Sequence, residues 1–62
     1  MTYVISFDEP SSHHLDKSGQ KTTSLIEDAM TFSSDDVALN YLERNQEQIE
    51  RLGTGAVPSR LR

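Results

Sequence analysis

The chain has 62 residues, no cysteine and a net charge of −4. This length allows one domain with a small core, and the lack of cysteine excludes disulfide bonds, so we expect a reducing, cytoplasmic setting. The acidic balance excludes direct binding to nucleic acid or to an anionic membrane, because phosphates repel carboxylates. It favours a basic protein surface as the partner.

The chain contains no apolar stretch long enough to span a membrane, and no signal-peptide pattern follows Met1. We therefore expect a complete reading frame, and a protein that acts without a leader or a membrane anchor.

The first predicted element is a strand over residues 2–7, in which Tyr3, Ile5 and Phe7 alternate on one face. Pro10 prevents its continuation, because proline has no backbone donor.

Two short, polar strands are expected next, over residues 12–15 and 20–23. They flank the sequence Asp-Lys-Ser-Gly at residues 16–19, which fits a type I turn. These segments therefore predict a hairpin. Ser24 and Glu27 then form the Ser-x-x-Glu pattern of a capping box, which predicts a short helical turn.

The clearest element is a long amphipathic helix over residues 34–52. Either Ser33 or Ser34 supplies the N-cap, acidic residues follow in the first turn, and Gly53 ends the helix. Residues 54–62 contain glycine, proline and arginine, and we expect them to form a flexible basic tail.

The predicted fold is a single α+β domain over residues 1–53, followed by the tail 54–62. It combines a small three-stranded antiparallel sheet, a short helical turn and one long amphipathic helix. The predicted core consists of Val4, Ile5, Phe7, Leu15, Ile26, Ala29, Phe32, Ala38, Tyr41 and Leu42.

Acidic side chains recur along one face of the long helix, at steps of three and four residues. Glu43, Glu47 and Glu50 fall within about 40° of Asp36 on a regular helix, as does Asn40, and the row extends over about 21 Å. We call these four carboxylates the acidic ridge. Two interpretations remain open: a solvated helix face, or a surface that imitates a phosphate backbone and occupies a basic groove. In the second, the partner-binding residues are Asp36, Glu43, Glu47, Glu50, Asp35, Glu27 and Asp28.

The opposite face of the helix is apolar and ends with Ile49 and Leu52. A helix of this length spans about 28 Å, whereas a strand of four residues spans about 13 Å. We therefore expect the end of the helix to overhang the sheet. Exposed there, Ile49 and Leu52 would support self-association as a homodimer, or docking into a partner's groove.

Residues typical of catalysis or metal binding are sparse. His13 and His14 are adjacent and point to opposite faces of a strand, so they do not share a metal readily. Ser11 and Ser12 lie beside them at a turn that offers no cavity for a reaction. We predict no catalytic, cofactor or metal site and therefore no enzymatic activity.

Four segments, each containing apolar residues, carry a resemblance to a known group of proteins: residues 3–7, 15–19, 26–32 and 38–42. Their spacing resembles that of the short hairpin-plus-helix proteins of bacteriophage and prophage genomes, over residues 3–45. Gln20 departs from that pattern, in which an aromatic residue follows the hairpin glycine. The resemblance implies a phage accessory protein in the host cytoplasm. Small acidic proteins of that kind include anti-CRISPR proteins and other inhibitors of host nucleic-acid machinery, but the resemblance carries over no functional residue.

The sequence thus predicts a small, non-enzymatic inhibitor that binds a host nucleic-acid-binding protein through an acidic, nucleic-acid-mimicking surface. The alternative is a structural or assembly module that homodimerises or docks through the apolar end of its helix. High salt should weaken the first kind of contact and strengthen the second.

Overall fold

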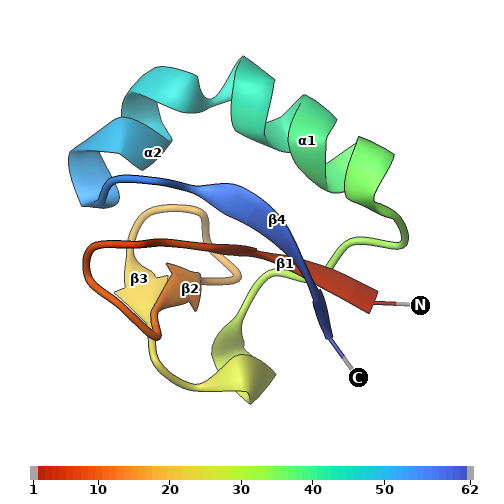
Figure 1. The fold of residues 1–62 in the computed structure, drawn as a ribbon, viewed down its shortest axis with the longest axis horizontal. Helices are drawn as coiled ribbons and strands as arrows, with labels where there is room; N and C mark the ends of the chain where they lie inside the picture. Colours follow the sequence, from red (N-terminus) through yellow and green to blue (C-terminus); the bar gives the residue numbers. More distant parts are fainter. Residues whose placement is uncertain (1, 62) are drawn as a thin grey trace.

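The structure is a computed structural model that describes residues 2–61. Its strands are β1 (Thr2–Ser6), β2 (His14–Leu15), β3 (Thr22–Thr23) and β4 (Val57–Leu61), and its helices are η1 (Ile26–Asp28, a 3₁₀ helix), α1 (Asp35–Arg44) and α2 (Gln46–Leu52). The strands form one antiparallel sheet in the order β3-β2-β1-β4. Figure 1 shows α1 and α2 together along one side of this sheet, with η1 at the opposite end of the molecule. The predicted α+β class is confirmed.

The predicted hairpin is present, and Asp16 organises its turn. The amide of Gly19 donates to the carbonyl oxygen of Asp16 at 2.9 Å, as a β-turn requires. The amide and the hydroxyl of Ser18 both donate to the Asp16 carboxylate. Gly19 has a φ of 74°, a conformation that glycine adopts without strain.

The predicted capping box at Ser24 does not form. The amide of Leu25 instead donates to the Thr23 hydroxyl at 3.1 Å, and only three residues become helical. The chain then runs extended beside β2 and β1, because the amide of Met30 donates to the Leu15 carbonyl and Phe32 pairs with Tyr3.

This extended path decides which of the nearby apolar residues enter the core. Ala29 and Phe32 are buried, as predicted, but Ile26 is 44% exposed. The prediction that Ile26 is a core residue was therefore wrong: it assumed a regular helical turn facing the sheet.

The long helix is divided at Asn45, which the sequence did not predict. Ser34 is the N-cap of α1, since its hydroxyl accepts from the Val37 amide at 3.2 Å. Asn45 leaves the helical conformation, with φ −118° and ψ 26°, and its side-chain amide donates to the carbonyl of Tyr41 at 2.9 Å. Such a bond competes with the helical backbone pattern and bends the chain.

The break turns the end of the helix into the core. Ile49 is only 1% exposed and packs with Ile5 and Phe7, and Leu52 is partly buried against the same cluster. The expected overhang is therefore absent, and Ile49 is not available for self-association in this fold. Leu52 could contribute only the exposed part of its side chain to self-association.

The expected flexible tail is also wrong for residues 57–61, which form β4. They pair with the whole of β1, from Thr2 opposite Leu61 to Ser6 opposite Val57. The second edge of β1 carries backbone groups that need partners, and β4 provides them.

Pro58 is compatible with this strand because of its register. Tyr3 exchanges both of its backbone hydrogen bonds with Phe32. In an antiparallel ladder the direction alternates, so Ile5, two residues later, also points its backbone groups away from β4. Pro58, directly opposite Ile5, therefore needs no donor toward β1.

The core lies between the sheet and the helices. Its main cluster consists of Ile5, Phe7, Leu15, Phe32, Ala38 and Ile49, and Val4 and Ala29 are also buried but lie outside this cluster. Tyr41 and Leu42, both predicted core residues, are partly buried and pack against this cluster. The helical layer is thus anchored from inside, and its outer face is left to solvent.

Candidate partner-binding surface

The acidic residues predicted on the long helix lie on the outer face of the helical layer. Their side chains are all exposed; they are Asp35, Asp36, Glu43, Glu47 and Glu50. The break does not scatter the ridge, because Glu43 of α1 shares one surface depression with Glu47 and another with Glu50, both of α2. The acidic ridge therefore continues from one helix to the next.

Asp35 and Asp36 also have a structural reason for their position. They occupy the first turn of α1, directly after the N-cap Ser34. Carboxylates there interact favourably with the unpaired amides and the positive end of the helix dipole. The N-terminus of α1 thus stabilises the charges of Asp35 and Asp36. Glu43 and Glu50 do not lie at a helix N-terminus, so they lack this interaction.

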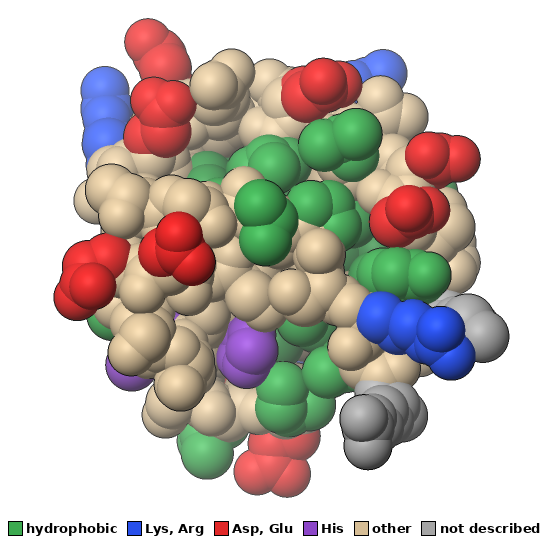
Figure 2. Space-filling view, in the orientation of Figure 1, with side chains coloured by type: hydrophobic (Ala, Val, Ile, Leu, Met, Phe, Trp, Pro, Cys, Tyr) green, Lys and Arg blue, Asp and Glu red, His purple; other side chains and the backbone are tan. Residues whose placement is uncertain are grey.

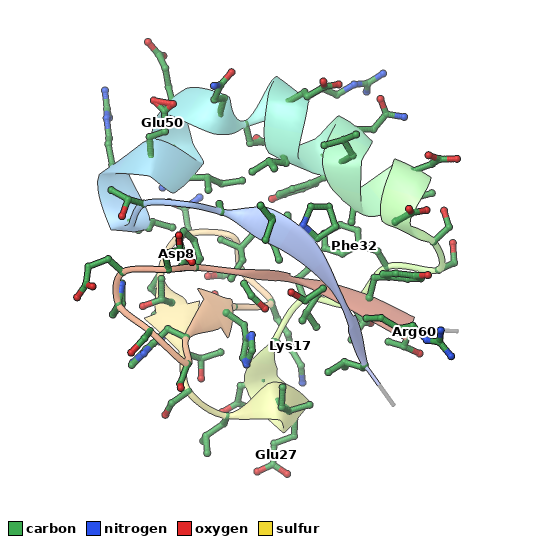
Figure 3. All side chains as sticks on the ribbon, viewed as in Figure 1. Asp8, Lys17, Glu27, Phe32, Glu50 and Arg60 are labelled. Atoms are coloured by element: carbon green, nitrogen blue, oxygen red, sulfur yellow. The ribbon has the colours of Figure 1, made fainter. Side chains whose placement is uncertain are left out.

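Glu27 and Asp28 do not extend the ridge. They belong to η1, and Figure 3 shows Glu27 at the far end of the molecule from Glu50. Asp28 lines a separate depression together with Lys17 and Lys21. The structure therefore separates these two residues from the other predicted partner-binding residues.

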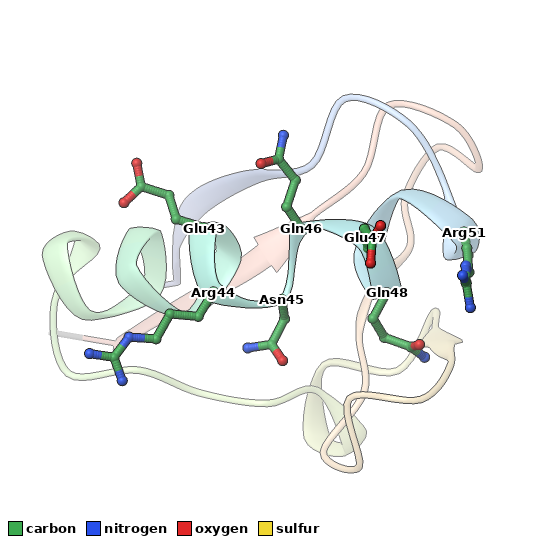
Figure 4. Close-up of a pocket in the computed structure, with 7 residues that line it drawn as sticks. All are labelled: Glu43, Arg44, Asn45, Gln46, Glu47, Gln48 and Arg51. Carbon is green, nitrogen blue, oxygen red and sulfur yellow. The ribbon is translucent and has the colours of Figure 1, made fainter.

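A polar depression of about 450 Å³ lies at the helix break (Figure 4). Seven residues line it: Glu43, Arg44, Asn45, Gln46, Glu47, Gln48 and Arg51. In Figure 4, Glu43 and Gln46 point to one side of the helix axis, and Arg44, Asn45 and Gln48 to the other. Two arginines accompany two glutamates, so this depression has no dominant sign of charge.

A second depression, of about 370 Å³, lies between the helices and the segment that leads into β4. We call it the apolar groove. Leu42, Ile49 and Ala56 supply its hydrophobic wall, and its only charged lining residues are Glu43 and Glu50. Figure 2 shows hydrophobic side chains gathered between the helices and β4, with acidic side chains around them. The groove therefore combines an apolar wall with a purely acidic rim.

Backbone bonds hold the outer wall of this groove in place. The amide of Thr54 donates to the carbonyl of Glu9 at 2.9 Å, and the amide of Asp8 donates to the carbonyl of Thr54 at 2.9 Å. A Cβ atom at Gly53 would approach the carbonyl of Glu9 and lie 2.7 Å from Cδ2 of Phe7. Gly53 is thus required by this close approach and not by a left-handed turn, since its φ is 178°.

Asp8 lies next to the same wall but is not among the residues that line the groove. A Cβ built on Gly55, which lines the groove, would lie 2.5 Å from an oxygen of the Asp8 side chain. Sequence reasoning missed this groove, because it depends on β4 and on residues 53–56 being ordered against the helices.

The histidines take part in local hydrogen bonds. Nδ1 of His14 lies 2.9 Å from the Ser6 hydroxyl, and Nδ1 of His13 lies 3.0 Å from the carbonyl oxygen of Ser11. Within residues 2–61, no group of three His, Asp or Glu side chains is placed to hold a metal ion. These contacts explain the histidines as parts of the loop and the sheet.

Comparison with models of known protein families, with curated protein sequences and with solved structures finds no match for this chain. In the described part of the chain, no helix combines the length and the apolar composition needed to cross a bilayer. The surface geometry is therefore the basis for assigning a function.

Proposed function

We propose that this protein is a non-enzymatic inhibitor that binds the basic surface of a nucleic-acid-binding protein through the acidic ridge. The single observation that carries the proposal is the exposure of Glu43, Glu47 and Glu50 across both helices. Spaced carboxylates on a rigid layer present a pattern of negative charge to which phosphate-binding lysines and arginines are complementary. A phage accessory protein of the anti-CRISPR type is the biological setting that we propose.

Rigidity of the ridge supports this proposal. Both helices are fixed from beneath, α1 by Ala38 and α2 by Ile49, which are buried in the core. The carboxylates thus stand on an ordered base, and a partner would not have to order the backbone on binding. The assembly alternative has lost its main support, since Ile49 lies inside the domain.

The proposal is tested by affinity capture with immobilised protein from a bacterial lysate, followed by identification of the retained proteins. We expect retention of a basic nucleic-acid-binding protein that is released by added nucleic acid and by raised salt, because both compete for the same charges. Glu43→Lys with Glu47→Lys should abolish this retention.

Glu27→Lys with Asp28→Lys provides the matched control. It makes the same change in net charge at exposed positions in η1, away from the ridge. If the control variant retains the basic protein and the Glu43, Glu47 variant does not, the result supports the ridge as the contact surface. Equal loss of retention in both double variants would show that only overall charge matters, and full retention by both would show that the ridge is not the contact surface; either result would make the proposal wrong.

A further inference from the structure

We infer that the apolar groove receives one large apolar side chain from a basic segment of the partner, whose flanking lysines or arginines meet Glu43 and Glu50. This inference rests on the proposed function and identifies the part of the acidic surface that would distinguish one basic partner from another. The groove contributes an anchor, and the carboxylates around it contribute the charge.

The dimensions and lining of the groove suit a side chain of this kind. Its volume is about 370 Å³, and its hydrophobic wall comes from Leu42, Ile49 and Ala56. Ile49 is buried and Leu42 partly buried, so the wall is fixed by the core and does not collapse into the space. An apolar side chain entering here would lose water from its surface without displacing part of the fold.

The charges around the groove specify the rest of the occupant. Glu43 and Glu50 line it, and no lysine or arginine is among its lining residues. The polar depression differs, because Arg44 and Arg51 accompany its glutamates. A basic segment therefore finds an all-acidic rim at the apolar groove and not at the polar depression.

A second copy of the chain is a poor occupant by the same reasoning. A two-fold contact centred on the groove would bring Glu43 and Glu50 of one copy against the same residues of the other. Like charges held together at an interface oppose association. Charge complementarity thus favours a basic partner over self-association.

Strand addition to β4 is also disfavoured, although β4 is the outermost strand on its side of the sheet. Pro58 directs its ring nitrogen toward the free edge, where it offers no donor to an added strand. Recognition at this place would therefore depend mainly on side chains, and a groove that accepts one apolar side chain is suited to it.

The test uses two synthetic peptides that differ at one position, Lys-Lys-Leu-Lys-Lys and Lys-Lys-Gly-Lys-Lys. Each is titrated into the ¹⁵N-labelled full chain, and the amide shifts of Leu42, Gln46 and Ala56 are followed. We expect the leucine peptide to bind about tenfold more tightly, since burial of a leucine supplies that much affinity. Its binding should shift these three amides.

Charge variants then locate the contact. Glu43→Gln with Glu50→Gln should weaken binding of the leucine peptide about three- to fivefold, as expected for exposed ion pairs. Glu27→Gln with Asp28→Asn removes the same charge from η1 and should change it less than twofold. Gln46→Arg, at an exposed position that lines the groove, should repel the peptide and is expected to fold.

The outcomes separate this inference from the proposed function. Equal affinities for the two peptides, with shifts along the acidic ridge, would overturn the role of the groove and leave the ridge as the binding surface. Failure of both peptides to bind would overturn the inference and count against the proposed function as well. The amide shifts of the groove residues are also recorded without peptide at increasing protein concentration. A change there would indicate that a second copy occupies the groove, which also overturns the inference.

Discussion

The rings of Phe32 and Tyr41 pack with their centroids 5.5 Å apart and their planes inclined by 53°. This contact joins α1 to the extended segment that pairs with Tyr3 of β1, since the backbone of Phe32 exchanges two hydrogen bonds with that residue. It thus connects the helical layer with the sheet, and the position of the acidic surface depends on it.

Phe32→Ala should lower the free energy of unfolding by about 3–5 kcal/mol, because it leaves a cavity between the two layers. In a chain of 62 residues this loss is comparable to the whole stability expected of so small a domain. We expect the variant to show no cooperative thermal transition by circular dichroism. Val37→Ala, at a helix position that is 46% exposed, is the control and should melt close to wild type. A cooperative, nearly unchanged melt of Phe32→Ala would contradict this packing.

Ile49→Ala should destabilise the protein by about 2–5 kcal/mol, because Ile49 is enclosed by the core and not by a second copy. Leu39→Ala, on an exposed apolar residue of α1, should have a much smaller effect. Chemical denaturation followed by circular dichroism measures both.

A dependence on protein concentration distinguishes the two roles of Ile49. If it stabilises the monomer, the midpoint of denaturation should be the same at low and at high protein concentration. A midpoint that rises with concentration in wild type, and not in the variant, would restore self-association through this residue.

The course of the chain up to the start of α1 could be predicted in outline from local patterns. Alternation in residues 2–7, the Asp-Lys-Ser-Gly turn and an N-cap serine before Asp35 each act through neighbouring residues, and the structure contains all three. Ile26 was misplaced because the extended path of residues 28–32 depends on pairing with β1 and β2, which are distant in sequence.

The helix break and β4 could not be predicted for the same reason. Asn45 is acceptable within a helix, and the bend there brings Ile49 into the same core cluster as Phe7, which is distant in sequence. Residues 57–61 contain Pro58 and little alternation, so they look irregular until β1 offers them an edge. The exposed acidic face was predictable from helical spacing, but the groove beside it requires this long-range pairing.

The carboxylate of Asp16 predicts how stability changes with pH. The hydroxyl of Ser18 donates to it, and this hydrogen bond, with help from the Ser18 amide and the charge of Lys21, lowers the pKa of Asp16. The fold stabilises the ionised carboxylate of Asp16 more than the unfolded chain does. This contribution to the stability of the fold is therefore fully present above the ordinary pKa of aspartate. It is lost as the pH falls through the lowered pKa.

Ser18→Ala removes the main cause of this shift, so the pKa of Asp16 should rise toward its usual range. The variant should be less stable than wild type at about pH 7, and the difference should close at an acid pH below the lowered pKa of Asp16, where the carboxyl is protonated in both proteins. Urea denaturation at the two pH values measures the difference, and NMR titration of the carboxyl measures the pKa. Ser11→Ala, at an exposed serine, is the control. A gap between Ser18→Ala and wild type that persists in acid would assign the effect to turn geometry and not to the charge.

The last prediction concerns the effect of the acidic ridge on folding. Glu43 and Glu47 are exposed, and they share the polar depression with Arg44 and Arg51. Reversal of both charges replaces attraction by repulsion in this depression, but solvent screens the interaction. We therefore expect Glu43→Lys with Glu47→Lys to cost no more than about 1 kcal/mol, which leaves a cooperative melt.

Salt separates this electrostatic cost from any damage to packing. The screening length at physiological ionic strength is about 8 Å and it shortens as salt is added. The difference in melting temperature between the double variant and wild type should therefore shrink between low and high salt. The control pair Glu27→Lys with Asp28→Lys should also melt cooperatively, since both positions are exposed. A large loss of stability in the ridge variant that salt does not reduce would mean that Glu43 or Glu47 supports the fold. Loss of partner binding in that variant could not then be attributed to the contact surface.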